Sequence, residues 1–279
     1  MKILRIMVIC FTFTAVVSCT GNNTLSGDKV LRMATTTSTD NTGLIDYLAP
    51  YIKADTGIEL KWVAVGTGKA FVLGKNCDVD VLMVHAPDAE NQYVDEGHGI
   101  CRSQIMYNDF VIIGPKNDPA RIKGKAVSEA LNRIVEKSAS FVSRGDDSGT
   151  NKKEMNLWKS ARLPVPDREQ WYIQTGQGML NTINIAAEID AYTLTDRGTF
   201  IKYESNYKGH PRLVILIEGH SSLRNQYSVI AINPDRCKNA QFELTMKFIN
   251  WITSSRARKL IGDFKLLGKQ LFIPNAQEH

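Results

Sequence analysis

Short apolar runs rich in β-branched residues alternate with amphipathic stretches along most of the chain. Runs at 29–34, 58–65 and 78–84 are followed by helix-like stretches at 41–54, 67–75 and 88–97. This order is typical of βα units built on a parallel sheet. The pattern therefore predicts an α/β protein, with no fixed-period repeat.

A long β-rich run over 104–119 follows, and the alternation then starts again. Helices are expected at 125–139, 148–162 and 178–189, and strands at 140–143, 171–175 and 190–195. A second long β-rich run, over 212–234, precedes a final helical stretch over 239–264.

The two long runs are expected to be strands that cross between two lobes. Residues 29–112 and 225–279 would then form lobe I, and residues 113–224, with crossing segments, would form lobe II. Ligands of open α/β sheets lie outside the carboxyl ends of the strands. Loops that follow strands in both lobes should therefore face one cleft.

The first nineteen residues have the order of an export signal. Lys2 and Arg5 precede an apolar run, 6–17, that is too short to span a bilayer comfortably. The ending "VVSC" resembles a bacterial lipoprotein signal. The resemblance implies that Cys19 becomes the acylated N-terminus and anchors the exported protein in the periplasm or on the outer face of the cell membrane. An ordinary signal peptide cut nearby is the alternative. Residues 20–28 are expected to be a flexible tether.

Charge and cysteine usage limit the remaining classes. The formal net charge is only +5, and no basic run with interleaved aromatic residues appears, so nucleic acid is not an expected partner. Cys77, Cys101 and Cys237 follow the signal; a Cys77–Cys101 bridge and three buried thiols both remain open. Together with His85 and His98, Cys101 lacks a zinc spacing, and no metal site or cofactor is expected.

Four predicted strand-to-helix junctions combine Gly with Ser or Thr: 34–42, 65–70, 143–154 and 174–180. Gly lets the backbone approach a ligand closely, and N–H groups at a helix start favour an anion. For the first junction, the alternative is that Ser38 or Thr39 is only a helix cap, with Asp40 in the first turn. Two junctions come from each expected lobe, so together they predict an anion site in the cleft.

Arg144 is the strongest single candidate, because it follows a predicted strand and its planar guanidinium suits two oxygens of one anion. An ion pair with Asp146 or Asp147 is the alternative. Asp147 is expected to cap the next helix. A carboxylate that faced a bound dianion would weaken binding, so at least one of these aspartates should be paired or point outward.

Catalytic signatures are missing. "GTGKA", with Lys69, lacks the spacing and the Ser or Thr of a nucleotide-binding P-loop, and "GHSS" at 219–222 lacks a nucleophile elbow. These absences favour a binding protein over an enzyme that acts on a phosphorylated or sulfated substrate.

The motifs "TTTSTDNTGLIDYL", "VGTGKA", "DVDVLMVHAP", "NDFVIIGP", "FVSRGDDSGTNKKE" and "TGQGM" resemble those of the tungstate-binding proteins of bacterial ABC transporters, relatives of molybdate-, sulfate- and phosphate-binding proteins. The resemblance implies a two-lobed, type II periplasmic-binding-protein fold. We expect the protein to be a monomer. The resemblance also implies a protein that closes on one tetrahedral oxyanion and delivers it to a membrane permease.

The same resemblance implies which residues contact the anion. The "TTTS" stretch maps onto Thr36, Thr37 and Ser38, and the arginine maps onto Arg144. A similar oxyanion loop in phosphate-binding proteins adds Ser148, Gly149 and Thr150. Positions at strand ends add Gly66, Thr67, Gly68, Thr175, Gly176 and Gly178.

The choice of oxyanion rests on the strand 79–84, which ends in His85-Ala86-Pro87 without an acid. A protonated phosphate gains from a carboxylate acceptor, whereas a cleft of donors alone prefers an anion without a proton. Asp88 is the one nearby acid. We therefore expect tungstate to bind at least as tightly as molybdate, much more tightly than sulfate, and phosphate not to bind. The preference for tungstate over molybdate follows from the resemblance only.

Overall fold

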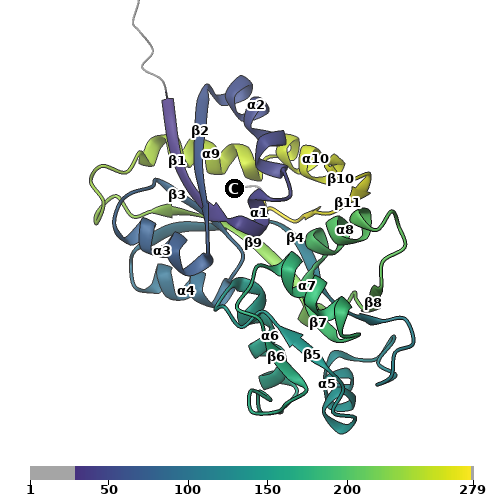
Figure 1. Ribbon diagram of the computed structural model, residues 1–279. Coiled ribbons are helices and arrows are strands. Elements are labelled where there is room, and N and C mark those ends of the chain that lie inside the picture. The colour runs from purple at the N-terminus through teal and green to yellow at the C-terminus, as the bar shows by residue number, and fades with distance from the viewer. Residues whose placement is uncertain (1–28, 278–279) are drawn as a thin grey trace, which may run out of the picture.

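The computed structural model describes residues 29–277 and shows two α/β lobes (Figure 1). The predicted α/β class is confirmed. The predicted signal, the lipidation site Cys19 and the tether lie outside the described residues. Between residues 29 and 277, no helix combines the length and the apolar character that a membrane crossing requires.

The elements of the first lobe come from both ends of the described chain. They are β1 (Lys29–Thr36), α1 (Thr37–Asp40), α2 (Leu44–Thr56), β2 (Ile58–Val65), α3 (Thr67–Lys75), β3 (Val81–Val84), α4 (Pro87–Asp95), α9 (Phe242–Thr253), α10 (Ser255–Asp263), β10 (Lys265–Leu266), β11 (Lys269–Gln270) and β12 (Ile273–Pro274).

The elements of the second lobe lie between two long strands. They are α5 (Val127–Glu136), β5 (Phe141–Ser143), α6 (Gly149–Ser160), β6 (Tyr172–Gln174), α7 (Met179–Glu188), β7 (Tyr192–Asp196), α8 (Arg197–Asn206), β8 (Leu213–Ile217) and the short 3₁₀ helix η1 (Ser221–Leu223). The long strands themselves are β4 (Gly99–Pro115) and β9 (Arg224–Ile232).

These two strands join the sheets of the lobes. The strand order is β2-β1-β3-β9-β4-β7-β5-β6. β1 pairs in parallel with β2 and β3, and β5 pairs in parallel with β6 and β7, as βα units require. β4 is antiparallel both to β9 and to β7. It therefore takes part in both sheets, and Figure 1 shows β4 and β9 running between the lobes.

Each lobe has its own apolar core. Side chains from β1, β3, α2 and α9 fill the largest cluster of the first lobe. In the second lobe, α5 buries Val127, Leu131 and Ile134, which share one helix face because they are four and three residues apart. Separate cores allow each lobe to hold its half of a cleft rigidly.

The sequence patterns misplaced several boundaries. No element was expected over α8, whose Phe200 and Tyr203 pack in the second lobe while Ile201 packs in the first. The final helical stretch is two helices, because Ser254 leaves the helical conformation and caps α10. Neither Ser38 nor Thr39 caps the first helix; the cap is Thr36, and the left-handed Gly43 (φ 78°) separates α1 from α2.

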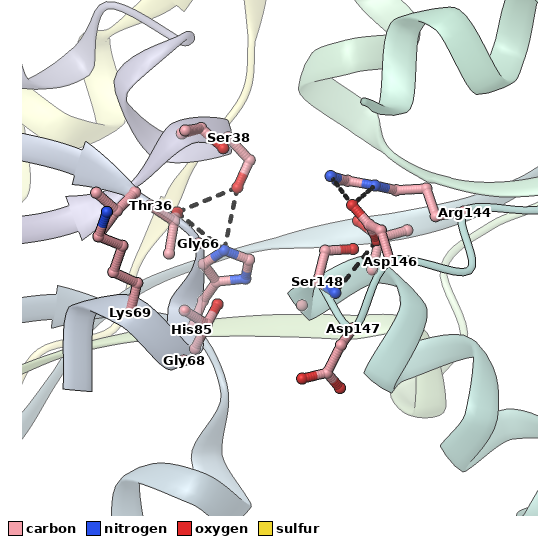
Figure 2. A pocket seen from close by; sticks show the side chains of 15 residues that line it. Thr36, Ser38, Gly66, Gly68, Lys69, His85, Arg144, Asp146, Asp147 and Ser148 are labelled. Atoms are coloured by element: carbon pink, nitrogen blue, oxygen red, sulfur yellow. Dashed lines mark hydrogen bonds and ion pairs between the residues drawn. The ribbon is translucent and has the colours of Figure 1, made fainter. Parts of the chain in front are cut away.

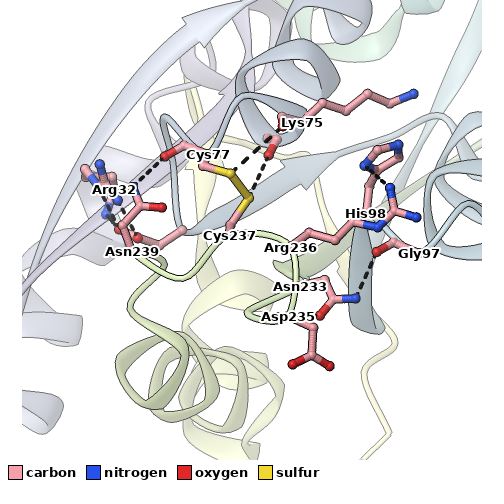
Figure 3. The surroundings of a disulfide bond; sticks show 12 residues. Arg32, Lys75, Cys77, Gly97, His98, Asn233, Asp235, Arg236, Cys237 and Asn239 are labelled. Carbon is pink, nitrogen blue, oxygen red and sulfur yellow. Dashed lines mark hydrogen bonds and ion pairs between the residues drawn. A yellow bond between two sulfur atoms is a disulfide. The ribbon is translucent and has the colours of Figure 1, made fainter.

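Both open alternatives for the cysteines are wrong. Cys77 forms a disulfide with Cys237, 160 residues further along the chain (Figure 3). Cys101 is free and exposed. The bridge ties the end of α3 to the loop that follows β9. Sequence spacing did not reveal this pairing, because the two positions meet only through the order β3-β9 in the sheet.

Candidate functional site

A cavity of about 390 Å³ lies between the lobes, at the ends of strands (Figure 2). Ten of the thirteen residues predicted to bind the ligand line it: Thr36, Thr37, Ser38, Gly66, Thr67, Gly68, Arg144, Ser148, Gly149 and Thr150. The other lining residues are Val65, Lys69, His85, Asp146 and Asp147. The first lobe supplies the earlier positions and the second lobe supplies positions 144–150.

The first-lobe half begins with a cluster of hydroxyl groups at the end of β1. Thr36 Oγ1 accepts from the backbone N–H of Thr39 at 3.3 Å and lies 3.1 Å from Ser38 Oγ. Thr35 points the other way, because neighbouring strand residues face opposite sides, and donates to the carbonyl of Met83 at 2.9 Å. β1 thus presents Thr36 at the cavity and buries Thr35, and α1 adds Ser38.

The second first-lobe segment is the start of α3. Gly66 precedes the helix with an extended backbone (φ −67°, ψ 151°) and offers no capping side chain, so the first N–H groups of α3 have no side-chain acceptor there. An added Cβ at Gly66 or Gly68 would meet nothing within 4 Å. Backbone donors and the positive end of the helix therefore face the cavity.

In the second lobe, Arg144 is bound to a neighbour in its own loop. Its Nη2 and Nε donate to Asp146 Oδ2 at 2.6 and 3.1 Å, and Asp146 Oδ1 accepts from the Ser148 N–H at 3.2 Å. The alternative ion pair considered for Arg144 is therefore present, with Asp146 as partner. The sequence predicted a cleft of hydrogen-bond donors alone. Because the Asp146 carboxylate lines the cavity, the site also contains an acceptor.

Asp147 does not cap the following helix; that prediction is wrong. Ser148 is the cap, and its hydroxyl accepts from the Asn151 N–H at 3.3 Å. Asp147 has a left-handed backbone (φ 57°), which turns its side chain outward, 85% exposed, to meet Lys152 at 3.0 Å. Figure 2 shows it pointing away from Ser38 and His85. Asp146 is thus paired with Arg144, and Asp147 faces outward and pairs with Lys152.

Two glycines of this loop are required by close approach. An added Cβ at the left-handed Gly145 (φ 59°) would lie 2.8 Å from Gln174 Cβ. At Gly149 it would lie 3.1 Å from His85 Cε1, across the gap between the lobes. Small residues here let the loop sit on β6 and let α6 approach the first lobe.

Three predicted ligand residues do not line the cavity. The backbone N–H groups of Thr175 and Gly176 donate to the carbonyls of Ser143 and Arg144 at 3.0 and 2.8 Å, and Gly178 precedes α7. Their junction runs beside the Arg144 loop and is occupied in holding it. Asp88, the acid that follows the end of β3 in the sequence, lines a neighbouring cavity instead.

Electrostatics favour an ionised Asp146. Burial raises the pKa of this carboxyl, but the hydrogen bonds from Ser148 and the charge of Arg144 outweigh burial and hold the pKa below its ordinary value. Among residues 29–277, no three His, Cys, Asp or Glu side chains gather where they could share a metal ion. The cavity is therefore a set of hydroxyls, backbone N–H groups and a guanidinium with its counterion.

His85 is the main residue that sequence reasoning missed. Its Nε2 lies 3.1 Å from both Thr36 Oγ1 and Ser38 Oγ, and its side chain is buried. The available signal was its position directly after a predicted strand, at the edge where the cleft was expected.

The chain is similar to known proteins over most of its length. A family model described as "PBP superfamily domain" matches residues 23–256. The tungstate-binding protein TupA of Campylobacter jejuni is 52% identical over 240 residues, which cover 86% of this chain and 89% of that protein.

Two solved structures extend the likeness. The tungstate binding protein TupA from Desulfovibrio alaskensis G20 has 60% sequence identity and a TM-score of 0.85, and the match covers 89% of this chain and 99% of that one. A structure described as the tungstate ABC transporter from Geobacter sulfurreducens has 44% identity and a TM-score of 0.75, with 85% and 99% coverage.

Proposed function

We propose a function from the premise that this chain belongs to the PBP superfamily and, within it, to the TupA family of tungstate-binding proteins. The protein binds the tungstate oxyanion outside the cytoplasm and delivers it to an ABC transporter. Molybdate is the second ligand to consider, because it is a tetrahedral dianion of nearly the same size.

One observation carries the proposal. Hydroxyls and the open start of α3 in one lobe face an arginine and the capped start of α6 in the other, across a single cavity. The ten lining residues predicted from the sequence are the proposed ligand set. Thr175, Gly176 and Gly178 are not in this set; their proposed role is to support the Arg144 loop.

The size of the cavity supports a closing motion. A water molecule's share of liquid volume is about 30 Å³, so an ion with four oxygens fills only part of about 390 Å³. Contacts to both lobes require the gap to narrow, and β4 and β9 are the strands that can bend. The ion would then stabilise a closed state through contacts that the open state lacks.

The remaining properties follow from this role. The protein acts as a carrier without chemistry of its own, and as a monomer, because one chain supplies both halves of the site. Cys19 carries the lipid anchor and residues 20–28 tether the body to the membrane. The Cys77–Cys237 disulfide fits an oxidising compartment.

Calorimetric titration of the soluble body tests the ligand. We expect saturable binding with tungstate at least as tight as molybdate, much tighter than sulfate, and no heat from phosphate, because Asp146, the carboxylate in the cavity lining, already accepts from Arg144 and from the Ser148 N–H. Phosphate that displaced tungstate at comparable concentration would contradict the proposal and would identify Asp146 or Asp88 as an acceptor for its proton. Consumption of a substrate in the same cleft would indicate an enzyme instead.

The anchor needs a separate experiment. Cys19→Ser should release the protein from the membrane fraction, because it removes the acyl chains on which stable retention depends. Tungstate affinity should not change, because the folded body begins after the tether. Mass spectrometry of the mature N-terminus would decide, and an unmodified terminus at another residue would exclude acylation.

A further inference from the structure

His85 lies where the two halves of the cavity meet, yet it is not in the proposed ligand set. It follows β3 in the first lobe, and the Cα of Gly149 in the second lobe is so close that a Cβ there would lie 3.1 Å from the imidazole Cε1. Figure 2 shows its ring between Thr36 and Ser38 on one side and the Ser148 loop on the other. The ring is therefore a contact between the lobes and a support of the hydroxyl cluster.

Asn225 decides which ring nitrogen carries the proton. Its amide nitrogen donates to Asn108 Oδ1 at 2.7 Å and to the Tyr227 hydroxyl at 3.2 Å, so its carbonyl oxygen faces His85 Nδ1 at 2.9 Å. A carbonyl oxygen only accepts, and Nδ1 must therefore be an N–H. In the neutral ring, Nε2 is then a bare acceptor.

The acceptor at Nε2 limits what the hydroxyls can offer to an anion. Thr36 and Ser38 each lie 3.1 Å from Nε2, each has one hydroxyl proton, and Nε2 has one lone pair. The Thr39 hydroxyl, 2.7 Å from Thr36 Oγ1, can donate to that oxygen and so leave the Thr36 proton free to turn. When one hydroxyl donates to Nε2, its oxygen lone pairs remain for the cavity, and these repel an anion. A neutral His85 therefore leaves only one of the two hydroxyl protons for the ligand.

We propose that oxyanion binding is coupled to uptake of one proton at His85 Nε2, so that the imidazolium donates to the hydroxyl oxygens and both hydroxyl protons turn to the anion. The proton comes from solvent or buffer, and no other bond changes. His85 is thus a positioning residue, which acts on the ligand through Thr36 and Ser38. This inference rests on the proposed function, since it deepens the account of the same site.

The surroundings of the ring suit a change of protonation on binding. Burial holds the pKa of His85 below its ordinary value, and the hydrogen bond that Nδ1 donates to Asn225 and the charge of Asp196 partly oppose this effect. The ring also stacks on Tyr227, with ring centroids 4.8 Å apart. A dianion in the cavity adds two negative charges and favours the imidazolium.

The other charged side chains on the elements around His85 either bind a neighbouring residue or lie at the edge of the cavity. They are Lys69 of α3, Asp88 and Glu90 of α4, Asp109 of β4, Arg144, Asp146 and Asp147 of the loop before α6, Lys153 of α6, and Arg224 of β9. Two arginines that would oppose the proton are neutralised by carboxylates, Arg144 by Asp146 and Arg102 by Glu90, so neither opposes it strongly.

The test is calorimetric titration of the mature protein with tungstate in two buffers of different ionisation enthalpy, near pH 7. We expect the observed enthalpy to depend on the buffer and to report about one proton taken up per ion. By linkage, affinity should fall about tenfold for each unit of pH increase above neutrality. Tungstate binding without buffer dependence would overturn the inference alone, whereas absence of tungstate binding at every pH would overturn the proposed function.

Variants locate the proton. His85→Gln places an amide N–H near Nε2 that donates at every pH, and we expect it to bind tungstate with no proton uptake. His85→Asn still reaches Asn225 but not the hydroxyls, and should bind more weakly, also without uptake. The control His98→Gln, at a half-buried histidine beside Arg236 and outside the cavity, should keep the full uptake. Uptake that persists in His85→Gln would overturn the assignment, and its loss in Asp146→Asn would place the proton on that carboxylate.

Discussion

The two halves of the cavity are built differently, although both lie at strand ends. In the first lobe, the buried Thr36 and His85 and the half-buried Ser38 form a network that already holds its geometry. In the second lobe, Arg144 is bound by Asp146, within a loop that has left-handed residues at Gly145 and Asp147. One half is organised in advance, and the other must exchange an internal partner for the ligand. Selectivity should therefore depend on the first half, and closure on the second.

The largest expected effect is a loss of stability when the disulfide that supports the first-lobe half of the cavity is removed. The start of α3 faces the cavity, and the Cys77–Cys237 bridge lies past its other end. Replacing both cysteines with alanine should lower the free energy of unfolding by about 3–5 kcal/mol, because the bridge closes a long loop. Tungstate affinity should stay within about twofold of the parent.

Chemical denaturation and calorimetry on the same variant separate these two effects. Cys101→Ala is the matched control, because that thiol is exposed and unpaired, and it should change neither quantity. A large loss of affinity in the bridge variant would show that the organised half depends on the disulfide.

The second effect concerns the charged half. Arg144→Ala should weaken tungstate binding by about 2–4 kcal/mol, because it removes the charged partner and leaves Asp146 facing the dianion. Arg144→Lys should recover only part of this loss, since an ammonium cannot reproduce the planar fork. Titration of both variants measures the effect, and parental affinity in Arg144→Ala would contradict the proposed role.

Removing one hydroxyl probes the organised half directly. Ser38→Ala should weaken binding by about 1.5 kcal/mol, the lower end for a hydrogen bond to a charged group. Thr35→Val is the matched control, because that hydroxyl donates to the Met83 carbonyl on the other face of β1 and should leave affinity unchanged. Equal losses in both variants would indicate a general disturbance of β1 instead of a ligand contact.

How much the sequence reveals differs between the same two halves. Alternation of apolar runs and Gly-Ser-Thr junctions locates strand ends, and the carboxyl ends of parallel strands meet, so the place of the cleft could be anticipated. Positions at strand ends suggested residues 66–68, whereas the other seven of the ten predicted lining residues followed from the family resemblance. Pairings that form only in the folded sheet could not be anticipated from the sequence. They are Cys77 with Cys237, and His85 with Asn225 across 140 residues. The short-range pair of Arg144 with Asp146 was visible as an alternative, but no pattern decides whether an arginine binds its neighbour or leaves it free for a ligand.

The smallest expected effect tests whether Asp146 competes with the ligand. Asp146→Asn keeps an oxygen that can accept from the Ser148 N–H but removes the charge that neutralises Arg144. At a separation of several ångströms in a partly solvated cleft, removing one negative charge should tighten tungstate binding by about 1 kcal/mol. The gain should shrink as salt is added, because screening weakens charge repulsion in an open cleft. Asp147→Asn is the matched control: its carboxylate is 85% exposed and pairs with Lys152, so affinity should not change. If Asp146→Asn instead weakens binding, the carboxylate orients Arg144 for the ligand, and the second half of the site is as organised as the first.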